Sequence, residues 1–208
     1  MKNHSDEYLL ITYKSAPNRP QLGPDEDTNA LKFENEDVTS GLRRPLVFFN
    51  AAAEISPKER FKSPPPDIIF HGSNFAITDK IYEQLSEIEI PNLILQPSIF
   101  IDDKAVWHEN YWYLTFTQSF DCWSRADSLY DPDPIEMNGK DFFSIYNYKL
   151  NNELLNKTEL TERLLFRLGG DLSWPIVAHK SIAKIFKTQN MDGVALTKIS
   201  DYGVNFFH

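Results

Sequence analysis

The sequence has little sulfur and no long apolar run, and these absences exclude several kinds of protein. A single cysteine, Cys122, leaves no partner for an intrachain disulfide and no basis for a zinc site built on several cysteines. No apolar stretch approaches the roughly 20 residues that a membrane-spanning helix requires. The apolar part of residues 1–13 is too short for a signal peptide, so we expect a cytoplasmic protein.

Motifs that carry chemistry are also scarce. None of the five histidines forms an HxH or HExxH pattern, so we expect no metal site. The sequence HGSN at 71–74 differs from the GxSxG nucleophile elbow, and Gly169 and Gly170 belong to neither a GxGxxG nor a Walker loop. Both stretches are typical of turns. We expect a protein without a cofactor and without catalytic residues.

Basic residues are outnumbered by acidic ones, 21 to 30, which gives a net charge of −9. The excess lies in the middle of the chain, because residues 67–160 carry 16 acids and only 6 bases. An acidic surface repels nucleic acid and anionic membranes and attracts basic proteins. We therefore expect neither nucleic acid nor a membrane as a partner. The alternative is that the acidic balance serves solubility alone.

Aromatic residues are plentiful and concentrate in residues 110–123, NYWYLTFTQSFDCW. Their density, together with β-branched neighbours, predicts a central strand over 111–117. Alternate residues share a face of a strand, and here one face is apolar and the other amphipathic. This pattern is typical of a strand that is covered on both sides.

The remaining pattern predicts an α+β protein with a mixed, largely antiparallel sheet and a few packed helices. Asn138–Gly139 is the strongest hairpin signal. The prolines of SPPP at 63–66 separate a strand-and-loop lobe, 1–65, from a main α+β domain, 66–208, within one compact unit. Further strands are expected at 8–14, 30–33, 45–50, 67–70, 142–150, 164–168 and 193–196, and a strand pair or a bent strand is expected at 93–101, where Pro97 interrupts the ladder. Helices are expected at 77–88 and at 180–188, and residues 175–178 lead into the second of these.

Taken in order, these segments resemble the immunity proteins of bacterial polymorphic toxin systems, including type VI and contact-dependent effector systems. The resemblance covers about residues 66–202. It rests on PDIIF, the helix that begins near Thr78, NYWYLTF, FDCWSRADS, FFSIYNYKL, LLFRL and the closing MDGVALTKI. In that family the last helix is followed by a strand that contains glycine, matched here at 192–194. Residues 1–65 match less well.

The resemblance implies a non-enzymatic protein that binds a cognate toxin and occludes its active site. It supplies no residues to carry over, so we infer contacts from local chemistry. Acids beside aromatic anchors suit a tight binder of a basic protein. Trp123 and Tyr130 also lie near these acids in sequence, as anchors or as core residues. The predicted toxin-binding residues are Asp102, Asp103, Trp107, Glu109, Asp131, Asp133 and Glu136.

Two other functions fit the sequence. A small hydrolase would use His71 or His179 together with a nearby carboxylate and a nucleophile. A structural subunit of a larger assembly would expose an apolar patch and oligomerise. For the immunity protein we expect a monomer or a homodimer.

Overall fold

The computed structural model describes residues 3–15, 19–31, 33–34, 44–52, 64–187 and 193–203. The chain divides into two compact units, each assembled from segments that are distant in the sequence. Each unit contains a hydrophobic core cluster. The first unit comprises Met1–Thr12, Gln118–Lys184 and Ala195–His208, and the second comprises Tyr13–Thr117 and Ile185–Val194.

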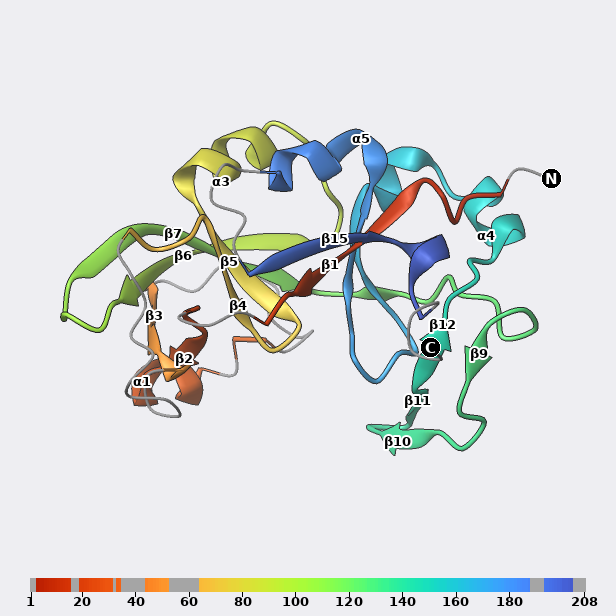
Figure 1. The fold of residues 1–208 in the computed structure, drawn as a ribbon, viewed down its shortest axis with the longest axis horizontal. Helices are drawn as coiled ribbons and strands as arrows, with labels where there is room; N and C mark the ends of the chain where they lie inside the picture. The colour runs from red at the N-terminus through yellow and green to blue at the C-terminus, as the bar shows by residue number, and fades with distance from the viewer. Residues whose placement is uncertain are drawn as a thin grey trace. The chain divides into compact units, whose positions relative to one another are not determined.

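The second unit is organised around a six-stranded sheet with the strand order β2-β3-β6-β7-β5-β4 (Figure 1). β3 runs parallel to β6, and the other neighbouring strands are antiparallel. The predicted α+β class with a mixed, largely antiparallel sheet is therefore confirmed. The strands are β2 (Leu22–Pro24), β3 (Leu46–Asn50), β4 (Ile68–His71), β5 (Asn74–Thr78), β6 (Leu93–Ile101) and β7 (Trp107–Phe116).

Strand β7 has the central place that the aromatic pattern predicts for 111–117. It pairs with β6 on one side and with β5 on the other, and the side chains of residues 113–116 are all buried. Tyr111 belongs to the hydrophobic core, whereas Trp112 stacks on Tyr82 of helix α3 (Asp79–Ser86) with 3.7 Å between ring centroids. Both faces of the strand are thus covered, as the sequence predicts.

Helix α3 confirms the prediction for 77–88, with shorter bounds. Ile81 and Leu85 are its buried residues, and Thr78 occupies the N-cap position. These two apolar residues are one helical turn apart, so they lie on the same face of the helix.

The short strand predicted at 30–33 is wrong, because helix α1 (Glu26–Ala30) reaches the start of that segment and a turn follows it. The carboxylate of Asp25 accepts a hydrogen bond of 2.7 Å from the backbone N–H of Thr28. A cap of this kind satisfies a free donor in the first helical turn and favours a helix over an extended chain.

The first unit contains a five-stranded sheet with the order β15-β1-β14-β13-β8 (Figure 1). β14 is antiparallel to both β1 and β13, and β8 runs parallel to β13. The strands predicted at 8–14, 164–168 and 193–196 are all present, and β14 covers a segment for which no strand was predicted. The sheet comprises β1 (Tyr8–Tyr13), β8 (Ser119–Phe120), β13 (Leu165–Leu168), β14 (Ile176–His179) and β15 (Val194–Lys198).

The helices of the first unit are short and have clear caps. Asn151 caps α4 (Asn152–Lys157), and His179 caps α5 (Lys180–Ala183). The helix predicted over 180–188 is therefore shorter than expected, and residues 188–192 lie outside the described part of the chain. The 3₁₀ turns among the described residues are η1 (Leu160–Arg163), η2 (Lys184–Phe186) and η3 (Ile199–Asp201).

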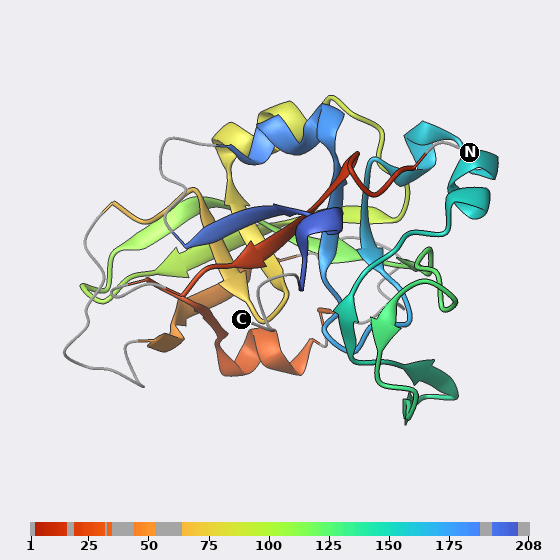
Figure 2. The ribbon, with the colours of Figure 1, turned by 45° about the vertical axis from the view of Figure 1, so that its right-hand side comes forward.

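Two small two-stranded sheets complete the first unit. β9 (Leu129–Tyr130) pairs with β12 (Ile145–Asn147), and β10 (Ile135–Met137) pairs with β11 (Lys140–Phe142). The turn between β10 and β11 is Asn138–Gly139, with φ values of 53° and 73°. Two consecutive positive φ angles are what a two-residue type I′ turn requires, so the predicted hairpin is confirmed. Both views place this hairpin at one end of the unit, beyond β9 and β12 (Figures 1 and 2).

The single strand predicted over 142–150 is wrong. β11 ends before Phe143 and β12 begins after Ser144, because Phe143 pairs with a different segment. Its backbone N–H donates to the carbonyl of Gly170 at 3.0 Å, and its carbonyl accepts from the N–H of Leu172 at 2.9 Å. The alternating pattern predicts the extended backbone correctly but does not reveal where the chain changes partner.

Strands from both sides of residue 65 pair within the six-stranded sheet, while β1 belongs to the sheet of the first unit. The boundary predicted at residue 65 stays a prediction, since residues 53–63 beside it lie outside the described part of the chain.

Two glycines of the first unit provide a test of packing. We expect Gly203→Ala to lower the free energy of unfolding by about 2–5 kcal/mol, because the φ of 82° disfavours any side chain and a Cβ would lie 1.8 Å from the carbonyl oxygen of Tyr146. Gly139→Ala is the matched control, since its φ is 73° but nothing lies within 4 Å of the added Cβ. It should cost only about 1–2 kcal/mol. Equal losses in urea unfolding would contradict this packing.

Candidate functional site

The seven predicted toxin-binding residues fall in both units. Asp102, Asp103, Trp107 and Glu109 lie at the end of the β6–β7 hairpin in the second unit, which we call the β6–β7 tip (residues 102–109). The other three lie in the first unit, on the turn before β10 and on β10 itself.

Asp102 holds the backbone of the β6–β7 tip. One carboxylate oxygen accepts hydrogen bonds from the backbone N–H groups of Lys104 and Val106 at 2.8 and 3.0 Å, and the other lies 3.1 Å from Nε2 of His108. Burial alone would raise the pKa of Asp102, but these hydrogen bonds lower it below its usual value. Because Asp102 is buried, its carboxylate stabilises the turn through these hydrogen bonds and is not part of the exposed acidic surface.

The same turn presents two apolar side chains to solvent. Trp107 is 57% exposed and Val106 is 48% exposed, so two adjacent apolar side chains lie outside the core. Glu109 is also exposed and lies two residues further along β7, on the same side of the strand as Trp107. Asp103 is half-buried and accepts a hydrogen bond of 2.9 Å from Nδ2 of Asn50. The tip therefore offers an apolar anchor with acidic neighbours on a fixed backbone.

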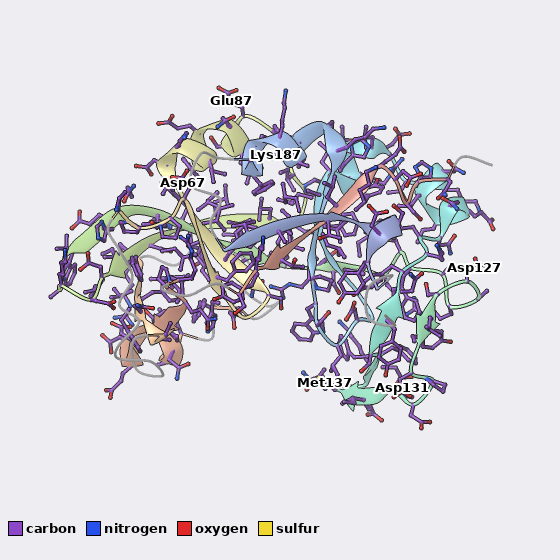
Figure 3. The ribbon with its side chains drawn as sticks, in the orientation of Figure 1. Asp67, Glu87, Asp127, Asp131, Met137 and Lys187 are labelled. Carbon is purple, nitrogen blue, oxygen red and sulfur yellow. The ribbon has the colours of Figure 1, made fainter. Side chains whose placement is uncertain are left out.

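The predicted acids of the first unit lie on and beside the β10–β11 hairpin. The carboxylate of Asp131 accepts a hydrogen bond of 3.1 Å from the backbone N–H of Asp133, which closes the turn before β10. Glu136 is exposed and lies directly opposite Asp141 across the hairpin. Figure 3 shows the side chains of Asp131 and Met137 at this end of the unit.

The aromatic residues near these acids divide between core and surface. Trp123 is 2% exposed and lies in the core of the first unit, so it is a core residue rather than an anchor. Tyr130 packs against it, with 4.9 Å between ring centroids. Cys122 is also buried, and burial raises the pKa of its thiol. Trp123 therefore belongs to the core, and Tyr130 is a partly buried residue packed against it.

A polar cluster that no sequence motif predicts lies on the sheet of the second unit. Oε1 of Glu34 accepts hydrogen bonds from the hydroxyl of Tyr113 and, at 2.6 Å, from Nδ2 of Asn74, and it lies 3.1 Å from Nδ1 of His71. Burial alone would raise the pKa of Glu34, but the hydrogen bonds from His71, Tyr113 and Asn74 bring it to about 2. Glu34 comes from a segment far away in sequence, so no local spacing could have revealed it.

The other histidine proposed for catalysis has a structural role. His179 is buried, its Nδ1 lies 2.8 Å from the hydroxyl of Ser181, and it accepts a hydrogen bond of 3.3 Å from the backbone N–H of that residue. It thereby caps helix α5. Within the described part of the chain, no three His, Cys, Asp or Glu side chains are arranged to hold a metal ion.

The cluster around Glu34 makes the stability of the protein depend on pH. The pKa of Glu34 in the folded protein is about 2, below its ordinary value of 4.5, so the ionised carboxylate stabilises the fold above pH 4.5. This contribution is lost as the pH falls from 4.5 towards 2. We expect Glu34→Gln to lower the urea midpoint at pH 7, and the difference from the wild type to shrink on acidification.

Glu83→Gln is the control for this prediction, because Glu83 is an exposed acid on α3 of the same unit. It should leave the urea midpoint almost unchanged at both pH values. A difference between wild type and Glu34→Gln that stayed constant from pH 7 to pH 3 would refute the proposed link between the charge of Glu34 and stability.

Comparison with known proteins does not place the chain in a family. No family model matches the sequence, and no curated protein matches it. Among the described helices, none is long and apolar enough to cross a membrane.

Proposed function

We propose that the protein is a non-enzymatic immunity protein that binds a cognate bacterial toxin and covers its active site. The exposed Trp107 is the observation that carries this proposal. Tryptophan is among the residues that contribute most to protein interfaces, because it buries a large area and loses few rotatable bonds. Trp107 and the neighbouring Val106 together form an exposed apolar surface that is not buried in the core and that a partner could cover.

The backbone beneath Trp107 supports a role in binding. The carboxylate of Asp102 fixes the turn, and the register of β6 with β7 places Trp107 opposite Ile101. A side chain on a rigid support is already oriented when the partner arrives, so little conformational entropy is lost on binding. Rigid presentation therefore favours slow dissociation.

The charge of the chain favours a basic toxin. Residues 67–160 carry a net charge of −10, and Asp103 and Glu109 place two carboxylates at the tip itself. Complementary charge raises the rate of association and affects binding more strongly at low salt. A toxin that acts on nucleic acid has the basic surface that such steering requires.

The proposal is tested by co-expression with the protein encoded by the adjacent open reading frame. The neighbour should be toxic when expressed alone, harmless when expressed together with this protein, and should co-purify with it in a fixed ratio. A neighbour that neither binds the protein nor affects growth would remove the proposed function.

Replacement of Trp107 tests the anchor. We expect Trp107→Ala to weaken binding of the co-purifying neighbour by about 30-fold or more, since truncation of an interface tryptophan commonly costs at least about 2 kcal/mol. The melting temperature should change little because the side chain is mostly exposed. Leu160→Ala, at an exposed leucine of the first unit, is the control and should bind like the wild type. Wild-type affinity of Trp107→Ala in calorimetry would count against the anchor.

A small hydrolase is a second candidate, favoured by the pairing of His71 with Glu34. An ionised carboxylate at Nδ1 orients an imidazole so that Nε2 can act as a general base. In the described part of the chain, Nε2 of His71 has no hydrogen-bond partner and therefore no nucleophile beside it. Hydrolysis of p-nitrophenyl esters by the purified protein that disappears in both His71→Ala and Glu34→Gln would favour this function over binding alone.

A further inference from the structure

A second exposed tryptophan, Trp174, lies in the first unit on a backbone that is strained. Its φ is 47°, in the left-handed region that bulky residues rarely adopt. The residue before a proline is normally extended, yet Pro175 follows. Trp174 remains 36% exposed. Strained residues persist where the surrounding structure imposes them, and they concentrate at binding sites.

A buried network imposes this conformation. Asp171 is 1% exposed, and its carboxylate accepts a hydrogen bond from the hydroxyl of Tyr148. The other oxygen accepts hydrogen bonds from the backbone N–H and the hydroxyl of Ser173, at 2.7 and 2.8 Å. The N–H of Trp174 donates to the carbonyl of Asp171 at 3.2 Å. The tryptophan is therefore presented on a turn that the core of the unit holds in place.

The exposed surface around Trp174 continues onto the β10–β11 hairpin. The rings of Trp174 and Phe142 are in contact, with 5.3 Å between centroids. Phe142 lies opposite Ile135 across the hairpin, so these two side chains share a face, and Ile135 is 51% exposed. Leu172, in the same turn as Trp174, is 37% exposed. We call Ile135, Phe142, Leu172 and Trp174 the apolar docking face.

The other face of the hairpin carries two like charges. Glu136 and Asp141 are directly opposite and both exposed, an arrangement that destabilises a strand pair. In the described part of the chain, neither carboxylate forms an ion pair. An isolated two-stranded sheet is marginally stable at best, so this repulsion weakens an element that has little stability to lose. A basic group placed between the two carboxylates would remove the repulsion.

We propose that the β10–β11 hairpin, together with the apolar docking face, binds a basic segment of the toxin. This inference rests on the proposed function, because the occupant is the same toxin. Charge complementarity favours a basic occupant, because residues 131–142 contain four acids and a single lysine. Because the apolar docking face and the two carboxylates lie on opposite faces of the hairpin, the segment would wrap over the hairpin. It would place an aliphatic or aromatic side chain against Trp174 and a lysine or arginine between Glu136 and Asp141.

Two variants test the two halves of this surface, with the co-purifying protein of the adjacent open reading frame as the probe. Glu136→Gln/Asp141→Asn removes both charges without changing the shape of the hairpin. Trp174→Gly removes the ring and also relieves the positive φ, so the turn is not strained further. Binding of each variant and of the wild type is measured by calorimetry at low and high salt, and folding is followed by thermal melting.

We expect the charge variant to bind at least about 10-fold more weakly at low salt, with a smaller effect at high salt, and to melt at or above the wild-type temperature. Trp174→Gly should bind at least about 10-fold more weakly at both salt concentrations. Glu159→Gln/Glu162→Gln is the matched control, since it removes two exposed charges from η1 and the residue before it in the same unit. It should bind almost like the wild type.

The possible outcomes separate the two proposals. If the wild type binds the neighbour and both hairpin variants bind equally well, this inference is overturned while the immunity function stands. An equal loss in the Glu159/Glu162 control would also overturn it, because the charge would then act only through general attraction. If the wild type does not bind the neighbour at all, the proposed function fails and this inference fails with it.

Discussion

The pairing of β6 with β7 is the interaction on which the second unit depends. The pairing extends from Leu93 opposite Phe116 to Ile101 opposite Trp107, with one irregularity between Ser98 and Phe100. β3 attaches to the outer side of β6, and β5 attaches to the outer side of β7. Because both faces of β7 are buried, a slip of one residue would move its side chains to the wrong faces, so burial specifies the register. The same register places Trp107 at the tip.

Much of this fold could be predicted from local pattern, since periodicity reports the backbone conformation and the buried faces. The expected central strand is present as β7, which spans Trp107–Phe116 and not 111–117, and Asn138–Gly139 forms the expected hairpin turn. What the pattern does not contain is the identity of the partner segment. Phe143 leaves the alternating stretch 142–150 to pair with the turn at 170–172, an interaction across more than twenty residues. Partner choice of this kind depends on tertiary packing, which a local window does not record.

The candidate site was harder to predict because some acidic residues are buried and hold the fold while others are exposed. The sequence does not distinguish the two kinds. Asp102 and Glu109 appear equivalent in sequence, yet Asp102 is buried and holds a turn while Glu109 is exposed. Glu34 is bound by three side chains that lower its pKa, whereas burial raises the pKa of Asp171 despite its hydrogen bonds. The net charge therefore overstates the number of carboxylates that a partner can meet. Only a structure distinguishes the charges used internally from those left for binding.

The same distinction applies to the polar cluster on the sheet of the second unit. The cluster of Glu34, His71 and Tyr113 already has a structural role, because it ties residues 33–34 to the sheet. Phe33 is 3% exposed there, and its carbonyl accepts a hydrogen bond of 3.2 Å from the hydroxyl of Thr115. A polar cluster that the fold requires does not call for a catalytic explanation. In the described part of the chain, the ring of Trp107 makes no aromatic, cation–π or hydrogen-bond contact, and the fold leaves more than half of its side chain exposed.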